Sequence, residues 1–473
     1  VRALRFDNLT IRDGTLTYLD PGRGVRQPVE NLNGTISART IDGPFAAQGK
    51  ATFRGVDVNF DLSIADMSRV RAVPARLSII FQRSLGEIAF RGVLQEASLF
   101  GPISGDLSFA GSDAALGLND LFALIRGTPV AAPKGVAAKA LGNDFRAEAT
   151  FFMDGRSLAA EDLTVGLGEV RAKGTLSGTM GRTPTFDLKL ATRSFNLDAL
   201  LEQKPATTTG VNLDKAAENI ESELEGFLVP TNLIGTMDIA VDGVIYRAGV
   251  IQNFAVKARA ENGSIIVESA SGQLPGRGKV ESSGLWMPTR GGTVYAGALT
   301  LEAGTPFALL RWAGFDMSGI AADRLNELNL TADVTLAPDR WALEDADLVL
   351  DGRRHRGTVA SERGGSPAFR LALTSDALDL DAYAGLLQVP ERPAPWDFLF
   401  PGDTVPRDLD LDVTLGRLTW GGDRFSDVTA VLRRDGDGLS ISRLAIGNWD
   451  GVSLAVSGRV RGTLAAPDLV IVA

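Results

Sequence analysis

The chain of 473 residues contains no cysteine and only one histidine. Disulfide frameworks and thiolate metal sites are therefore excluded, because both require cysteine sulfur. Zinc sites and histidine-dependent catalytic sites use several partners, and His355, in "DGRRHRGT", has no second histidine to work with. We therefore expect His355 to be a solvent-facing strand or turn residue, and we expect no metal and no cofactor.

Long apolar runs and an excess of positive charge are also missing. No stretch approaches the roughly 18 uncharged apolar residues of a membrane-spanning helix. The net charge of −10 argues against a nucleic-acid-binding surface, which needs a basic stripe. The chain starts at Val1 without a signal peptide and ends in the apolar strand pattern "PDLVIVA". Because natural chains cover or charge such an edge strand, we expect the sequence to be a segment of a longer protein.

The sequence lacks the motifs of catalysis and of nucleotide binding. Segments that begin at Gly43 and Gly272 resemble a phosphate-binding loop, but each has five residues between Gly and Gly-Lys where that loop has four. Ala51 and Val280 follow the lysines, in place of the hydroxyl residue that would bind the metal. No Gly-x-Ser-x-Gly or His-Glu-x-x-His constellation occurs either. We therefore predict that the protein is not an enzyme.

The chain is rich in glycine, with 53 residues, and in alternating apolar and polar residues. "VDVNFDLSIAD" from Val56 and "RDLDLDVTLG" from Arg407 both follow this pattern. Alternation of this kind predicts strands with one apolar face and one solvated face. Asp408, Asp410 and Asp412 then belong to a solvated face and not to a cation site. Frequent Asn-Gly and Asp-Gly turns favour antiparallel hairpins.

Short helices are expected to interrupt the strands. Two candidates are "SDAALGLNDLFALIRG", which ends at Gly127, and "TPFALLRWAG", which has Pro306 in its first turn. "LDALLEQ" and "LDAYAGLLQ" each begin beside an aspartate that we expect to cap the helix, Asp198 and Asp381. The pattern predicts β modules over 1–201 and 231–388 and the start of a further module over 408–473, connected by a linker with a short helix at 202–230 and a proline-rich segment at 389–407.

One phrase occurs twice in the sequence. Residues 161–200 and 344–383 align without a gap and are identical at fourteen of forty positions. "PTFDLKLATRSFNLDALL" in the first copy corresponds to "PAFRLALTSDALDLDAYA" in the second. Hairpins that are finished by a short helix and then repeated indicate modules that stack side by side. Such an array favours a long surface over a compact catalytic pocket.

Several of these segments resemble the AsmA family of Gram-negative bacterial proteins, above all "LTIRDGTLTYLDPGRGVRQPVENLNGTISARTIDGPFAAQGKATFRGVDVNFDLSIAD" and "GRLTWGGDRFSDVTAVLRRDGDGLSISRLAIGNWDGVSLAVSGRVRG". Modules of that family close with Gly-x-Leu-x-Gly, a proline, an alternating strand and a Leu-Asp-Ala helix start. Here the motif runs from Gly174 through Pro184 to Ala199. The second copy departs from it by having Ser361 in place of the second glycine.

The resemblance implies a location, a fold and a function. Such proteins are anchored in the inner membrane by an N-terminal helix and extend into the periplasm. Their elongated, curved antiparallel sheet forms a taco-like groove, as in the bridge-like lipid transfer proteins. The resemblance implies phospholipid transport between the inner and outer membranes during outer-membrane biogenesis. The expected partners are phospholipid acyl chains, the inner membrane, and the outer membrane or its proteins.

A groove of this kind would bind acyl chains with apolar residues from several strands. The candidates are Leu16, Tyr18, Phe60, Leu62, Leu107, Phe109, Phe186, Leu188, Leu190, Phe369, Leu371, Leu373, Leu411 and Val413. The same alternation is typical of a closed sandwich core, so the sequence leaves open whether these residues line a groove or fill a core. A second hypothesis is a periplasmic scaffold that binds outer-membrane β-barrel proteins by strand addition. An open apolar interior favours the lipid hypothesis, and a filled core favours the scaffold.

Overall fold

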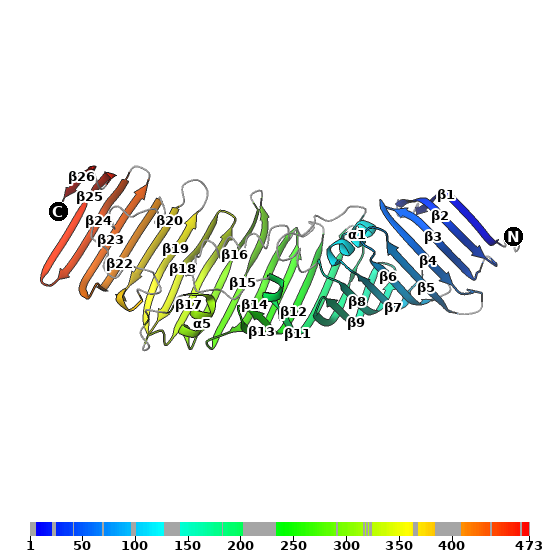
Figure 1. The fold of residues 1–473 in the computed structure, drawn as a ribbon, viewed down its shortest axis with the longest axis horizontal. Helices are drawn as coiled ribbons and strands as arrows, with labels where there is room; N and C mark the ends of the chain where they lie inside the picture. The colour runs from blue at the N-terminus through cyan, green and yellow to red at the C-terminus, as the bar shows by residue number, and fades with distance from the viewer. Residues whose placement is uncertain are drawn as a thin grey trace. The chain divides into compact units, whose positions relative to one another are not determined.

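The chain is mainly β, as predicted, with an open, curved and mostly antiparallel sheet and a few short helices (Figure 1). The computed structural model describes residues 6–20, 25–40, 42–68, 71–95, 101–126, 142–181, 183–201, 233–289, 292–315, 317, 320, 324–362, 368–383, 408–435, 438–463 and 466–472. The predicted connecting segments 202–230 and 389–407 lie outside these residues.

The chain divides into two compact units. Unit 1 comprises Val1–Leu201, Glu223–Asp242 and Lys257–Gly263, and unit 2 comprises Glu202–Ser222, Gly243–Val256 and Ser264–Ala473. Strands β12 (Ile234–Tyr246) and β13 (Gly249–Glu261) contain residues of both units.

Unit 1 is built on strands that pair in the order of the sequence. Each strand from β1 to β11 pairs antiparallel with the next, and these strands are coloured from blue to green in Figure 1. The elements are β1 (Phe6–Asp20), β2 (Val25–Ala38), β3 (Phe45–Phe53), β4 (Val56–Ile64), β5 (Ala72–Phe81), β6 (Glu87–Gln95), β7 (Ile103–Gly111), α1 (Ala114–Arg126), β8 (Phe145–Asp154), β9 (Ser157–Leu167), β10 (Val170–Thr179), β11 (Thr185–Asn196) and α3 (Leu197–Leu201).

Unit 2 has the same plan. Its elements after β13 are β14 (Ser264–Leu274), β15 (Gly278–Thr289), β16 (Gly292–Ala303), α5 (Pro306–Ala313), β17 (Leu328–Ala337), β18 (Arg340–Leu350), β19 (Arg353–Glu362), β20 (Ala368–Ser375), β21 (Leu378–Asp379), the 3-10 helix η1 (Asp381–Tyr383), β22 (Asp408–Trp420), β23 (Asp423–Asp435), β24 (Gly438–Trp449), β25 (Val452–Thr463) and β26 (Ala466–Val472).

One pairing in unit 2 departs from the expected hairpins. β20 and β22 run parallel, with Phe369 beside Leu409 and Leu371 beside Leu411. Parallel neighbours need a crossover connection, and β21 and η1 lie between β20 and β22 in the sequence. The repeated helix start therefore marks the place where one module ends and the next begins.

The two faces of the sheet differ as the alternation predicts. Along β8 and β10, half-buried and exposed residues alternate without interruption. In β4, Val56, Val58 and Ile64 are buried, whereas Asp57 and Asp61 are exposed. We call the side with the buried and half-buried residues the apolar face and the side with the exposed residues the polar face. Asp410 and Asp412 are exposed on the polar face of β22, as expected from their alternation with leucine and valine.

The expected helix after β7 is confirmed as α1, and it covers one end of the apolar face of unit 1. The carboxylate of Asp113 accepts the N–H of Leu116 at 2.9 Å and so caps its first turn. Ala123 of α1 packs with Phe81, which is 0% exposed, and with Val58 of the sheet. α1 is therefore held by apolar packing at the strand ends and leaves the middle of the strands uncovered.

The second expected helix, α5, is also confirmed. Pro306 lies in its first turn, and Gly314 ends it with a φ of 98°, a left-handed conformation that favours glycine. The indole N–H of Trp312 donates to the carbonyl of Tyr246 at 2.9 Å, and the two rings meet edge to face. In unit 2, α5 occupies the position that α1 has in unit 1, over one end of the strands.

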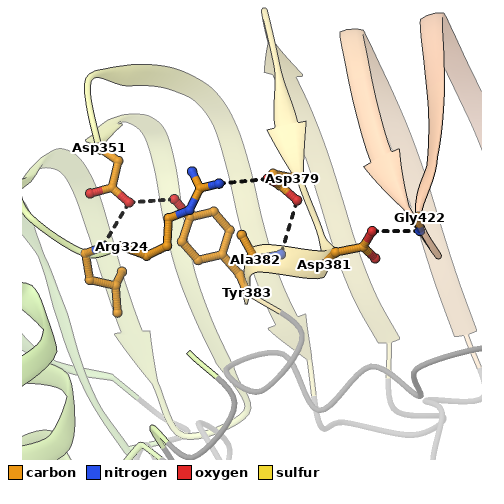
Figure 2. A network of polar contacts seen from close by, with 8 residues as sticks. Arg324, Asp351, Asp379, Asp381, Ala382, Tyr383 and Gly422 are labelled. Atoms are coloured by element: carbon orange, nitrogen blue, oxygen red, sulfur yellow. Dashed lines mark hydrogen bonds and ion pairs between the residues drawn. The ribbon is translucent and has the colours of Figure 1, made fainter. Parts of the chain in front are cut away.

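The expected helix caps are wrong in both copies of the repeat. Asn196 and Asp379, each two residues before the expected aspartate, accept backbone N–H groups of α3 and η1 at 3.0 and 3.1 Å. Asp198 and Asp381 lie inside the helical turns. Asp381 instead accepts the N–H of Gly422 at 2.9 Å, which ties η1 to the turn after β22 (Figure 2).

Candidate functional site

The strand register of unit 1 aligns apolar residues into lines that cross the strands. The best-defined line runs through the middle of the apolar face, and a bulge in β9 interrupts its regular pairing between Ala149 and Leu163. Its members are Leu9, Ile36, Ala47, Leu62, Leu77, Phe90, Leu107, Ala149, Leu163, Gly174 and Leu190. At about 4.8 Å per strand, a line across these eleven strands extends roughly 50 Å. No polar side chain interrupts it.

Most residues of this central line are only half-buried. The exceptions are Leu163, which is 8% exposed, and Leu9, which is 41% exposed. The most completely buried apolar residues of unit 1 lie at the two ends of the strands, where Phe81 packs under α1 and Val73 packs with Ile64 and Leu94. A closed sandwich would bury its central residues most completely. The described residues of unit 1 show the opposite pattern, with an accessible apolar strip between two packed ends.

Unit 2 carries the corresponding lines. One of them includes the parallel pair Leu371 and Leu411, and the neighbouring line includes Leu373 and Val413. The first line, which we call the central line of unit 2, consists of Val267, Gly284, Gly297, Val334, Leu343, Val359, Leu371, Leu411, Leu432 and Ile441. Leu432 and Ile441 belong to a packed cluster, whereas Leu371 and Leu411 remain half-buried.

The structure places the candidate residues from the sequence on these apolar faces. Phe60, Leu62, Leu107, Leu188 and Leu190 lie on the apolar face of unit 1 and are half-buried. Phe109 packs edge to face on Phe145 beneath α1, Phe186 covers Gly235, and Leu16 of β1 is 58% exposed. The side chain of Tyr18 lies outside the described part of the structure. In unit 2, neighbouring positions of β20 and β22 hold the remaining candidates, Phe369, Leu371, Leu373, Leu411 and Val413.

Glycines bend the sheet toward its apolar face. A Cβ atom added to Gly174 would lie 1.7 Å from the carbonyl oxygen of Lys189 on the next strand, and one added to Gly357 would lie 1.8 Å from that of Ala372. Such contact means that the neighbouring backbone has folded into the space of a side chain, as at a glycine kink. The same holds for other glycines of this face: Gly34, Gly49, Gly92, Gly105, Gly178, Gly284 and Gly297.

The two copies of the sequence repeat share the glycine and bulge positions at which the sheet bends. Gly174 and Gly357 occupy the same position in the two copies, and both are kink glycines. Asp162 and Asp345 also correspond, and both lie in β-bulges with φ of 49° and 48°. Aspartate tolerates this left-handed conformation better than most residues, and bulges increase strand bending. The repeated identities therefore specify curvature as much as they specify apolar contacts.

A partly buried polar network fastens η1 at the end of the apolar face (Figure 2). The hydroxyl of Tyr383 donates to Asp351 at 2.8 Å, and Asp351 also accepts the N–H groups of Leu325 and Asn326. Burial, followed by the hydrogen bond to Asp351, raises the pKa of Tyr383 to about 12. Arg324 reaches Asp379 at 3.2 Å, which connects the network to the cap of η1.

The expectation that His355 faces solvent is wrong. It is a strand residue of β19, but it is 7% exposed and lies on the apolar face opposite Leu348 and Ser375. Burial, and secondarily the charge of Arg353, holds the pKa of His355 below its ordinary value of 6.5. The arginines on either side, Arg354 and Arg356, point to the polar face, where both contact Asp347.

The buried histidine predicts a pH dependence of stability. Its folded-state pKa is lowered, so the unfolded chain binds the proton more readily, and stability is complete above about pH 6.5 and declines as the pH falls toward the folded-state pKa. We expect urea unfolding to show a smaller loss between pH 7.5 and 5.5 in His355→Gln than in the wild type. Equal losses in the two proteins would contradict a buried neutral imidazole.

Hollows on the polar face have a different chemistry. One of them, about 660 Å³, lies over β4 to β9 of unit 1. Charged side chains of both signs line it, among them Arg76, Arg91, Asp61, Asp106 and Glu148. A surface of this kind does not suit acyl chains, because their contact would remove charged groups from water without a partner. The apolar face is therefore the candidate site.

Comparison with protein-family models, with curated proteins and with solved structures finds no match to this chain. Among the described residues, no helix has the length and apolar character to cross a membrane. The same residues contain no group of three or more histidine, aspartate or glutamate side chains placed to hold a metal ion. The geometry of the apolar face is therefore the feature of this chain that bears on function.

Sequence reasoning missed part of this site. Leu77, Phe90 and Leu163 complete the central line of unit 1, and Leu343 and Val359 complete that of unit 2. Alternation shows which residues share a face within a strand, but the register that joins neighbouring strands depends on pairing. The kink glycines did leave a signal, because each occupies an apolar position in the alternation.

Proposed function

We propose that this chain shields lipid acyl chains on its apolar face and serves phospholipid transport between two membranes. The observation that carries the proposal is the central line of unit 1, which is apolar and mostly half-buried across eleven paired strands. Exposing an acyl chain to water costs about 0.8 kcal/mol per methylene. A continuous apolar strip lowers that cost at every point along its length.

The bending of the sheet supports the same function. Kink glycines and bulges fold each unit toward the apolar face, so the strip lies on the inner side of a curve. A curved apolar surface contacts an acyl chain along more of its circumference than a flat one. The polar face remains in contact with water and keeps the chain soluble.

The resemblance of the repeated segments to the AsmA family supports a place for this activity. On that basis we propose a periplasmic location with attachment to the inner membrane, and a role in outer-membrane biogenesis. The proposed ligand is a phospholipid, and the proposed chemistry is transfer without reaction. The described residues offer an apolar surface for binding, and they contain no group of three or more histidine, aspartate or glutamate side chains placed to hold a metal ion.

Native mass spectrometry of the purified chain, before and after a detergent wash, tests this function. We expect several phospholipid molecules per chain before the wash, and reloading when phospholipid is added afterwards. Several copies are expected because each unit offers about 50 Å of apolar track. A chain that carries no lipid and accepts none would contradict the proposal and would favour a protein-binding scaffold.

A further inference from the structure

An arginine of β23 lies on the apolar face of unit 2. Arg434 of β23 pairs in register with Leu409 and, on the other side, with Leu439. Leu432, two residues earlier, belongs to the central line of this unit. Most arginines of the sheet point to the polar face, so the position of this guanidinium calls for a reason.

The charge of Arg434 is not compensated by the protein. Its Nη1 atom is shielded from water and has no hydrogen-bond partner. Some arginines on the polar face have carboxylate partners, as Arg370 has Glu362 and Arg340 has Glu344. None of the ion pairs in the described part of the chain includes Arg434. A shielded donor without an acceptor is costly, and a bound anion would remove that cost.

The position of Arg434 in the strand is also informative. It lies one residue before the end of β23, at the rim of the apolar face. The same register line carries Trp286 and Trp341, and the indole Nε1 of Trp286 is likewise shielded without an acceptor. In β16 and β17 this line lies at the strand ends opposite those that α5 covers. Side chains with an apolar body and a polar tip are suited to a boundary between apolar and aqueous surroundings.

We propose that Arg434 binds the phosphate of a phospholipid whose acyl chains lie on the apolar face of unit 2, and that head groups emerge at this rim. The inference depends on the function proposed above, and it identifies the phosphate as the part of the lipid that the protein recognises. A guanidinium matches phosphate with two parallel N–H···O hydrogen bonds. The adjacent Leu409 and Leu439 would contact the start of the acyl chains.

The test compares Arg434→Gln with Arg433→Gln. Arg433 is the matched control, because it is exposed on the polar face of the same strand, opposite Asp410. Each protein is titrated with a phospholipid and with a diacylglycerol of the same acyl chains, and binding is followed by native mass spectrometry. We expect Arg434→Gln to weaken phospholipid binding about tenfold and to leave diacylglycerol binding unchanged. Arg433→Gln should alter neither.

The outcomes separate this inference from the function on which it depends. A wild-type chain that binds neither lipid overturns both. A wild-type chain that binds both lipids, with Arg434→Gln unchanged toward each, overturns the head-group contact alone. Soluble glycerol phosphate serves as a further probe: if it binds the wild type as tightly as the phospholipid does, the site is one for a free anion and the inference is wrong.

Discussion

Replacing Leu371 by aspartate is expected to reduce the phospholipid bound to the purified chain at least tenfold. Leu371 is half-buried on the central line of unit 2, between Val359 and Leu411. A carboxylate there would have to lose water when an acyl chain covers it, and a charge in an apolar lipid environment costs about 2.5–3.5 kcal/mol. Each 1.4 kcal/mol corresponds to about a factor of ten in affinity.

The matched control for this variant is Thr374→Asp. Thr374 is in the same strand but is exposed on the polar face, between Arg356 and Thr414. The added charge there remains in water, so lipid loading should match that of the wild type. Circular dichroism and urea unfolding would show that both variants are folded. Normal loading in a folded Leu371→Asp would show that lipid does not lie on this line.

A methyl group at Gly174 is expected to destabilise unit 1 by at least about 2 kcal/mol, the range typical of overpacked sites. Its Cβ would lie 1.7 Å from the carbonyl oxygen of Lys189, which is backbone and cannot rotate away. β10 and β11 would have to separate, and the bend at this pair would open. Urea unfolding of Gly174→Ala against the wild type measures the change in the free energy of unfolding.

Gly181→Ala provides the comparison for this second prediction. The nearest atom to a Cβ at Gly181 is the Nη1 atom of Arg156, 3.8 Å away, so the added methyl group has room. Its effect should stay within about 0.5 kcal/mol, as for most surface substitutions. Equal stability of the Gly174 and Gly181 variants would mean that Gly174 isn't required for the bend.

Much of this fold could be predicted because its signals are local. The alternation from Val56 predicts β4, and the proline and glycine around α5 predict both of its ends. Asp162 and Asp345 recur because bulges at fixed places need a residue that tolerates a left-handed backbone. These features depend on the conformation of a few neighbouring residues, which the sequence records directly.

The features that were missed depend on contacts between distant segments. Alternation does not show which strands pair or in which direction they run, so it does not predict that β20 and β22 are parallel neighbours. His355 alternates in phase with Gly357 and Val359, which indicates that all three share the apolar face. The general preference of histidine for exposed positions led to the opposite prediction. Arg434 was missed because its partners Leu409 and Leu439 come from other strands.

The central claim is that acyl chains lie on the apolar face, and photo-crosslinking tests it most directly. A benzoylphenylalanine side chain would replace Leu371 in one protein and Thr374 in another, and each would be loaded with phospholipid and irradiated. These positions lie on opposite faces of one strand, so they differ in surroundings and not in distance along the sheet. We predict a covalent lipid adduct at position 371 and none at position 374. Equal labelling at both positions, or no labelling at position 371 in a chain that still holds lipid, would contradict the claim.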